Sequence, residues 1–173
     1  LTILKKSRPK PMAWTKNQTI EPITDKTKLR NRALYWLSKR DYSIKDFSTK
    51  LDKVCELDEL KQALLVDFIA RDWLNEQRYM QGFVRSKLAA GLGQRRIVQE
   101  LQQHGIKSSD SNLYLEQLEV DWFEQAKNTY LRKYGETPVD DYREKSKRYR
   151  YMQYRGFDSD QIQYSMTHES TDW

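Results

Sequence analysis

The residues best suited to chemistry in this sequence are arginines and lysines, which gather in two clusters. The first lies mid-chain, where Arg78 and Arg85, seven residues apart, share one face of a predicted helix over about 75–90. Guanidinium groups bind carboxylates and phosphates through forked hydrogen bonds, so such a cluster indicates a surface for an anionic partner. Its members are Arg78, Arg85, Lys87, Arg95 and Arg96.

Arg95 and Arg96 stand out because they lie in the first turn of a short predicted helix, within "GLGQRRIVQELQQHGI". That turn is the positive end of the helix dipole, where a cation costs about 0.3–1 kcal/mol. Pairing of Arg96 with Glu100 one turn later would offset about 0.2–0.5 kcal/mol. Arg95 is left unexplained, so we interpret the arginine pair as a binding feature.

The second cluster lies in "YREKSKRYRYMQYRGF", from Tyr142 to Phe157, where cations and tyrosines alternate around a single acid, Glu144. Tyrosine rings can stack on bases, and the cations can neutralise phosphates or carboxylates. The alternative is an amphipathic helix whose tyrosines pack inward and whose charges are solvated. The candidate binding residues here are Lys147, Arg148, Arg150 and Arg155.

No motif typical of an enzyme accompanies these clusters. His104 and His168 are the only histidines and lack metal-ligand spacing, and the sequence has no glycine-rich phosphate loop or serine elbow. His104 precedes a predicted C-terminal glycine, where an imidazole suits the helix end. We interpret Cys55 as a packing residue. We therefore expect no catalysis, no metal and no cofactor.

The charge is concentrated near the N-terminus. Residues 1–32 hold nine basic and two acidic residues, a balance of +7, whereas the rest hold 22 basic and 23 acidic residues, a balance of −1. A single cysteine excludes an intramolecular disulfide and favours a reducing compartment. No apolar run approaches the roughly 20 residues of a membrane span. We expect a monomeric, cytoplasmic protein that avoids membranes.

The elements that must position the cations are predicted to be helices. Apolar residues recur at spacings of three and four from residue 28 onward, with Ser43 and Asn75 as caps. Gly93, Gly105 and Gly156 are expected to begin or end helices, and Trp122 to anchor one. The expected ranges are about 29–40, 44–54, 58–72, 75–90, 94–104, 109–119, 121–134 and 139–155, followed by a short helix that starts at Asp158 or Ser159.

The helices repeat with a period of about 50 residues. "SIKDFSTKL" matches "GQRRIVQEL" at an offset of 50, and "LQQHGI" matches "MQYRGF" at an offset of 51. Units this small must stack on their neighbours to bury a core. We predict an all-α, elongated tandem array of three three-helix repeats, with an irregular basic N-terminal arm. The expected parts are the arm 1–27 and the repeats 28–74, 75–120 and 121–173.

Four segments in order resemble the RecX family of regulatory proteins. "GLGQRRIVQELQQHGI" is similar to the family signature G-Y-G-x-R-R-I-x-x-E-L-x-x-K-G-I, and "LNEQRYMQGFVRSKLAAG" to the segment before it. "DWFEQAKNTYLRKYG" and "RYMQYRGF" are similar to the later D-W and R-F-L-x-x-R-G-F elements. The resemblance covers about residues 29–168. Gln94, Asn75 and Leu92 depart from the pattern but keep cap or apolar character.

The resemblance implies a tandem three-helix-repeat fold and a negative regulator of the RecA recombinase, active in DNA repair, homologous recombination and the SOS response. Proteins of this family bind the groove of the RecA–single-stranded DNA filament and limit its extension, strand exchange and coprotease activity. The two basic clusters become the candidate contact surfaces. The alternative function is a helical module that competes directly for single-stranded DNA, which would make binding fall steeply with salt.

Overall fold

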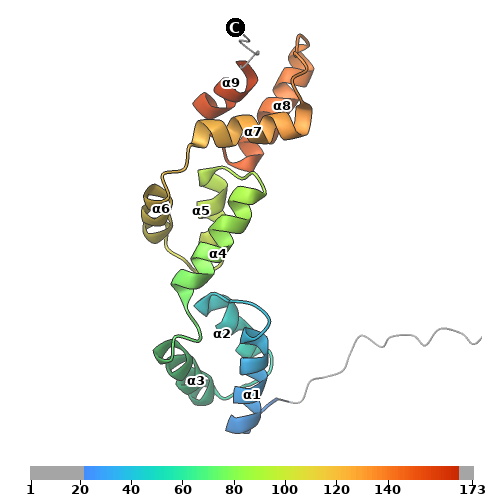
Figure 1. Ribbon diagram of the computed structural model, residues 1–173. Helices are drawn as coiled ribbons and strands as arrows, with labels where there is room; N and C mark the ends of the chain where they lie inside the picture. Colours follow the sequence, from blue (N-terminus) through green and yellow to red (C-terminus); the bar gives the residue numbers. More distant parts are fainter. Residues whose placement is uncertain (1–21, 168–173) are drawn as a thin grey trace, which may run out of the picture.

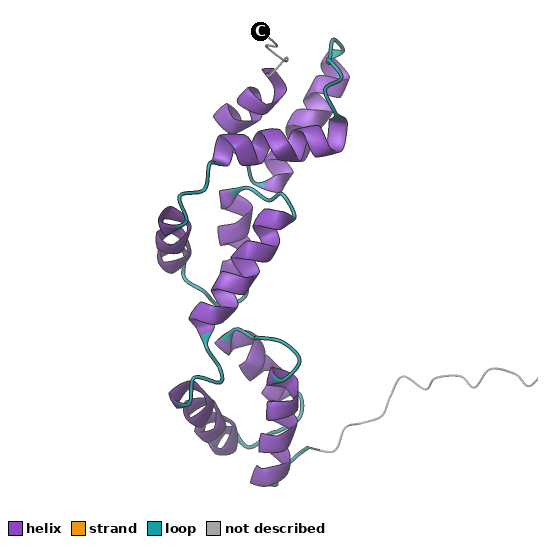
Figure 2. Cartoon of the chain, in the orientation of Figure 1, coloured by secondary structure: helices purple, strands orange, loops and turns teal. Residues whose placement is uncertain are grey.

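The chain is built of helices joined by short loops, as the computed structural model, which describes residues 22–167, makes clear (Figure 2). Every regular element in that range is an α-helix, which confirms the predicted fold class. The helices are α1 (Lys26–Leu37), α2 (Ile44–Asp52), α3 (Asp58–Ala70), α4 (Glu76–Ala89), α5 (Gln94–Gln103), α6 (Ser108–Gln117), α7 (Trp122–Tyr134), α8 (Tyr142–Arg155) and α9 (Ser159–Thr167). None of these is long and apolar enough to cross a bilayer.

Local capping chemistry sets the ends of these helices. The side chains of Ser43 and Asn75 accept hydrogen bonds from the backbone N–H groups of Asp46 (3.0 Å) and Arg78 (2.7 Å), as predicted. Gly105 and Gly156 adopt left-handed φ angles of 91° and 95° at the ends of α5 and α8. Asp158 begins α9, because its side chain and that of Gln161 each bind the other's backbone N–H.

Several observed helix ends differ from the approximate predicted ranges by two or three residues, including the end of the first helix at Leu37. The first helix begins at Lys26, inside the predicted arm, because Asp25 Oδ1 accepts a hydrogen bond from the N–H of Lys28 at 2.7 Å. The eighth begins at Tyr142 and not near residue 139, because Asp141 caps it through the N–H of Glu144. Ile23 packs on the first core, whereas the rest of the predicted arm up to residue 21 lies outside the described residues.

The helix triplets follow one another along one long axis (Figure 1). Each triplet surrounds its own cluster of buried apolar side chains, and burial of this area is the main force that holds a triplet together. Fully or almost fully buried members include Leu29, Phe47, Leu51 and Phe68 in the first cluster, Val84, Ile97, Leu101 and Leu115 in the second, and Ala126, Met152, Phe157 and Ile162 in the third. The array is therefore elongated, as the periodicity predicts.

Replacing Ser43 by alanine should lower the free energy of unfolding by about 1 kcal/mol, because a buried N-cap hydroxyl is lost from α2. Urea unfolding followed by circular dichroism measures this. Ser109→Ala is the matched control, since the Ser109 hydroxyl is exposed and contacts only the neighbouring Asp110. Equal losses in the two variants would contradict the capping role.

Candidate partner-binding surface

The second helices of two neighbouring triplets meet end to end by direct backbone contact. The N–H of Gly93, at the start of α5, donates to the carbonyl of Arg155 at the end of α8 (2.9 Å). A Cβ on Gly93 would lie 2.5 Å from the carbonyl carbon and oxygen of Gly156, and a Cβ on Gly156 would lie 2.5 Å from the backbone nitrogen of Arg96. Only glycine fits at either position.

The same arrangement recurs one repeat earlier, where the end of α5 meets the start of α2. Lys45 Nζ donates to the carbonyl of Gln103 (2.8 Å), and His104 Nδ1 lies 2.7 Å from Asp46 Oδ2. A Cβ on Gly105 would lie 2.8 Å from the Cβ of Lys45. We call α8, α5 and α2, stacked head to tail through these two junctions, the helix column.

The helix column accounts for much of the unusual charge at the start of α5. The negative, carbonyl-bearing end of α8 lies against the positive first turn of α5, so the two dipoles partly cancel there. Arg96 also binds Glu100 (2.7 Å) and lies 5.0 Å from the ring centroid of Tyr154 on α8. Arg95, by contrast, is exposed and has no ion pair within residues 22–167.

Side chains of the third triplet cap the end of α4 and thereby fix the junction between the second and third triplets. The last carbonyls of a helix have few partners within it, and among those of residues 88–91 only Leu88 O receives a backbone N–H, from Gly91 (2.9 Å). Each of these four consecutive carbonyls accepts a hydrogen bond from α7 or α8. The pairs are Gln125 Nε2 to Leu88 O (2.7 Å), Arg132 Nη1 to Ala89 O (3.2 Å), Arg155 Nη1 to Ala90 O (2.7 Å) and Thr129 Oγ1 to Gly91 O (3.3 Å).

Sequence reasoning missed Gln125, Thr129 and Arg132 as junction residues. Their spacing of four and three places them on one face of α7, which was the available signal. Trp122, at the start of α7, packs against the second core. The third triplet is thus attached to the second by polar contacts as well as by apolar burial.

Every acidic residue in the helix column has a hydrogen-bonding or ionic partner. Asp46 binds His104, Asp52 binds Lys61, Glu100 binds both Lys87 and Arg96, and Glu144 binds Lys147 and Arg148. Partial burial works to raise the pKa of Glu100, but hydrogen bonds from Lys87 and Arg96 hold that pKa below its usual value. The hydrogen bond from Arg148 likewise lowers the pKa of Glu144.

The exposed faces of the helix column therefore carry mainly cations, amides and hydroxyls, with Asp52 as their one exposed acid. On α8, Arg143, Lys147, Arg150 and Tyr154 lie at i, i+4, i+7 and i+11, which is one helix face. A shallow depression of about 530 Å³ is lined by Tyr142, Arg143, Ser146, Lys147 and Arg150. The exposed residues of α5 are Arg95, Gln99, Gln102 and Gln103, and those of α2 include Lys45, Thr49 and Asp52.

The third helices of the triplets have the opposite character. α6 and α9 contain no lysine or arginine, and the one lysine of α3, Lys61, binds Asp52 and Asp58. In Figure 1, α3, α6 and α9 lie on the left, with α2, α5 and α8 to their right. The positive charge of these two sets of helices is thus concentrated in α8 and α5, whereas α2 is balanced and α3, α6 and α9 offer no unpaired cation among the described residues.

The structure places eight of the nine candidate cations in three settings. Arg95, Arg150 and Lys147 are exposed on the helix column, and Arg85 is exposed on α4. Lys87 and Arg96 hold Glu100, and Arg155 caps α4, so these three are partly occupied within the fold. Arg78 binds Asp41 (2.9 Å) and the carbonyls of Asp72 and Trp73, which ties the α3–α4 linker to the first triplet.

Arg148 is inaccessible to a partner, although the sequence suggested otherwise. Its side chain is 9% exposed and donates to Tyr130 Oη (2.8 Å) and the carbonyl of Thr137 (3.1 Å). Its guanidinium lies 4.7 Å from the ring centroid of Tyr134. Arg148 therefore anchors the α7–α8 loop and is not available for contact with a partner.

The remaining candidates for chemistry have structural positions. Cys55 is buried, with its Sγ 3.8 Å from the carbonyl of Leu57, and His104 lies against the rings of Tyr79 and Phe83. Among the described side chains, no group of three or more histidines, cysteines and acids could hold a metal ion. The surface of the helix column is accordingly the candidate functional site.

Comparison with known proteins identifies matching family models and relatives. Residues 75–112 match the model described as RecX, second three-helix domain, and residues 119–166 match RecX, third three-helix domain. The chain is 39% identical over 137 residues to "Regulatory protein RecX" of Actinobacillus pleuropneumoniae serotype 5b (strain L20), covering 79% of this chain and 89% of that protein. It is 34% identical over 134 residues to the protein of that name from Ectopseudomonas mendocina (strain ymp), covering 78% and 89%.

Solved structures with the same fold agree with these matches. "Crystal structure of regulatory protein RecX" superimposes with a TM-score of 0.67 at 26% identity, covering 81% of this chain and 70% of that chain. "Crystal structure of RecX from Lactobacillus salivarius" gives a TM-score of 0.66 at 23% identity, covering 80% and 92%. Because its sequence identity is only 23%, the second match supports the fold alone.

Gly156→Ala should destabilise the protein by about 2 kcal/mol or more, because a left-handed φ costs a non-glycine residue roughly 1–2 kcal/mol and the new Cβ would press on α5. Gly82→Ala is the matched control. Gly82 lies inside α4 with no atom within 4 Å of a new Cβ, so alanine should stabilise by about 0.5–1 kcal/mol. Urea unfolding compares the two, and destabilisation by Gly82→Ala alone would refute the junction.

Acidification should weaken the contact between α4 and α5, because Glu100 on α5 pairs with Lys87 on α4 as well as with Arg96. Because the folded pKa of Glu100 lies below the unfolded value of about 4.3, its ion pairs contribute fully above that value. The contribution is lost as the pH falls from about 5 through the folded pKa. Glu100→Gln should therefore reduce stability at pH 7 more than at pH 3, measured by urea unfolding at each pH. If Glu100→Gln lowered the free energy of unfolding equally at pH 7 and pH 3, the ion pairs of Glu100 would make no net contribution to stability.

Proposed function

We propose, since the chain belongs to the RecX family of regulatory proteins, that it is a negative regulator of the RecA recombinase. In this proposal it binds the RecA–single-stranded DNA filament along its helical groove and limits filament extension, strand exchange and coprotease activity. It acts by binding and performs no catalytic step of its own. The observation that best supports the proposal is the helix column, whose acids are all paired while its exposed cations remain available.

The proposed contact residues are the cations of the helix column that the fold leaves accessible. They are Arg143, Lys147 and Arg150 on α8 and Arg95 on α5, with Arg85 on α4 as an outlying member. A filament presents the same groups at regular intervals, so an array with cations on successive repeats can engage several protomers at once. Carboxylates of the protein and phosphates of the strand are the groups that guanidinium and ammonium cations recognise.

The rigidity of the α5–α8 junction supports this mode of binding. Side-chain caps on α4 and the glycine contact hold the second and third triplets at one angle before any partner arrives. Cations that are already positioned lose less conformational freedom on binding, so more of the attraction contributes to affinity. An elongated array of fixed shape is suited to a long groove.

Direct competition for single-stranded DNA is the second candidate function. The observation that favours it is the exposure of Tyr142 (81%) and Tyr154 (69%) beside the α8 cations. Exposed tyrosines next to cations can stack on bases while the cations neutralise phosphates. In that case binding would require naked strand and no recombinase.

A charge-reversal variant tests the proposal. Arg95→Glu combined with Arg150→Glu should abolish inhibition of RecA ATP turnover and weaken co-sedimentation with filaments at least about tenfold, since attraction becomes repulsion. Thermal unfolding should be almost unchanged, because both side chains are exposed. Lys107→Glu is the control, since this exposed cation begins α6 and lies outside the helix column.

Two outcomes would overturn the proposed contact. Normal inhibition by the double variant would remove the helix column from the interface. Equal affinity of the wild-type protein for naked strand and for filaments, with a salt dependence that rises by roughly 0.7 in slope for each phosphate contacted, would instead support direct competition for DNA.

A further inference from the structure

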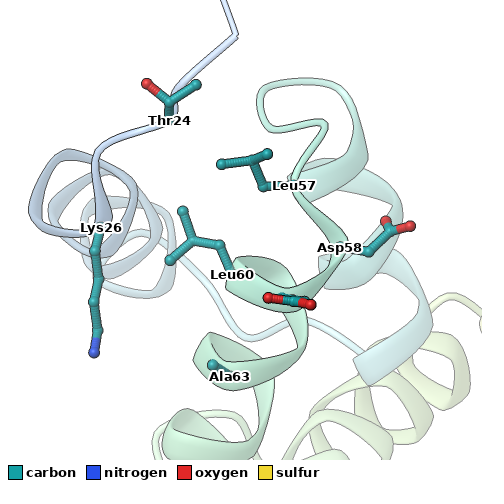
Figure 3. A pocket seen from close by; sticks show the side chains of 7 residues that line it. Thr24, Lys26, Leu57, Asp58, Leu60 and Ala63 are labelled. Atoms are coloured by element: carbon teal, nitrogen blue, oxygen red, sulfur yellow. The ribbon is translucent and has the colours of Figure 1, made fainter.

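A groove lies in the first triplet, between the start of α1 and the start of α3, and its volume is about 560 Å³ (Figure 3). Leu57, Leu60 and Ala63 supply its apolar wall, and Thr24 and Lys26 line the opposite side. Figure 3 shows the side chains of Leu57 and Leu60 extending toward the chain at Thr24. A volume of this size is within the range of about 300–1,000 Å³ typical of binding pockets.

Leu57 is an unusual residue for its position in this groove. It is the N-cap of α3, where serine, threonine, aspartate or asparagine normally accepts a hydrogen bond from the helix, and it provides no such bond. Its side chain is 47% exposed and contributes little to the first core. The acids Asp58 and Glu59 in the first turn favour this helix end electrostatically, but they leave the Leu57 side chain open to an apolar contact from outside the triplet.

Asp58 and Glu59 lie on the α3 side of this apolar wall, whereas Lys26 is the one cation among the lining residues. Glu56 and Glu59 are exposed, with no ion pair among residues 22–167, and Asp58 binds only Lys61 of its own helix. A segment that combines an apolar side chain with nearby lysines or arginines would match both the wall and its rim.

We propose that the groove is the docking site of the chain's own N-terminal segment, residues 1–21, with Trp14 against Leu57 and Leu60. This segment lies outside the described residues, and its sequence combines Met12 and Trp14 with five lysines or arginines and a single acid. Lys16 follows Trp14 closely and is the partner for Glu59. The composition is the one that the groove selects.

The attachment point of the segment favours it over any free partner. The N–H of Ile23 donates to the carbonyl of Val54 (2.7 Å), which fixes the exit of the segment beside the α2–α3 turn. Thr24, immediately after, lines the groove itself. A tethered segment has an effective concentration of about millimolar, so even weak contacts are occupied. The ten residues from Trp14 to Thr24 can span up to about 33 Å, enough to turn back onto the groove.

The test uses the full chain with 5-fluorotryptophan and methyl-labelled leucine, observed by NMR. We expect nuclear Overhauser contacts between the Trp14 ring and the methyl groups of Leu57 and Leu60. Leu57→Lys should abolish these contacts and move the Trp14 fluorine signal to the position of a solvated tryptophan. Because Leu57 is half-exposed, this variant should remain folded. Leu113→Lys, which changes an exposed leucine on α6, should leave the signal unmoved.

A second variant and a dilution series distinguish other occupants. Glu59→Lys should weaken the Trp14 contacts without changing the apolar wall. In Trp14→Phe, the phenylalanine ring should retain part of the contact with the leucine methyl groups. A Trp14 signal at the solvated position in the wild-type protein overturns the proposal. So does a groove whose leucine methyl signals move with protein concentration while Trp14 does not, because a second copy would then be the occupant.

Discussion

The structure depends on one contact, the direct approach of two backbones at Gly93 and Gly156. Because neither residue has a Cβ, the start of α5 can lie against the end of α8 and accept its orientation. The hydrogen bond from Gly93 to Arg155 then fixes the register between the helices. The head-to-tail order of α8, α5 and α2 and the partial cancellation of their dipoles follow from this contact and its counterpart at Gly105.

The junctions are chemically different from the cores. Inside a triplet, apolar burial provides the stability, whereas between the second and third triplets side chains of α7 and α8 satisfy the carbonyls that end α4. Hydrogen bonds are directional, so this attachment fixes the angle between the two triplets while burying little of their surface. Because little surface is buried at this junction, the exposed face of the helix column stays accessible to a partner.

Local chemistry made much of the fold predictable. The helices from Ser43 and Asn75, and the left-handed ends at Gly105 and Gly156, follow from caps, apolar spacing and glycine, which act within a few residues of the chain. The orientation of the cations was harder to foresee. Arg148 points inward because Tyr130 and Thr137 lie there in space, and no spacing along α8 reveals that. Arg95 and Arg96 are neighbours in sequence, yet only Arg96 meets Glu100 and Tyr154.

The two junctions also give the middle triplet a distinct position among the three. It alone is held at both ends, through Gly93 on one side and Gly105 on the other, whereas each outer triplet has a single neighbour. In a linear array with nearest-neighbour coupling, the unit with two neighbours is the last to open. Local unfolding would therefore begin in the outer triplets, and the central triplet would be the last to unfold.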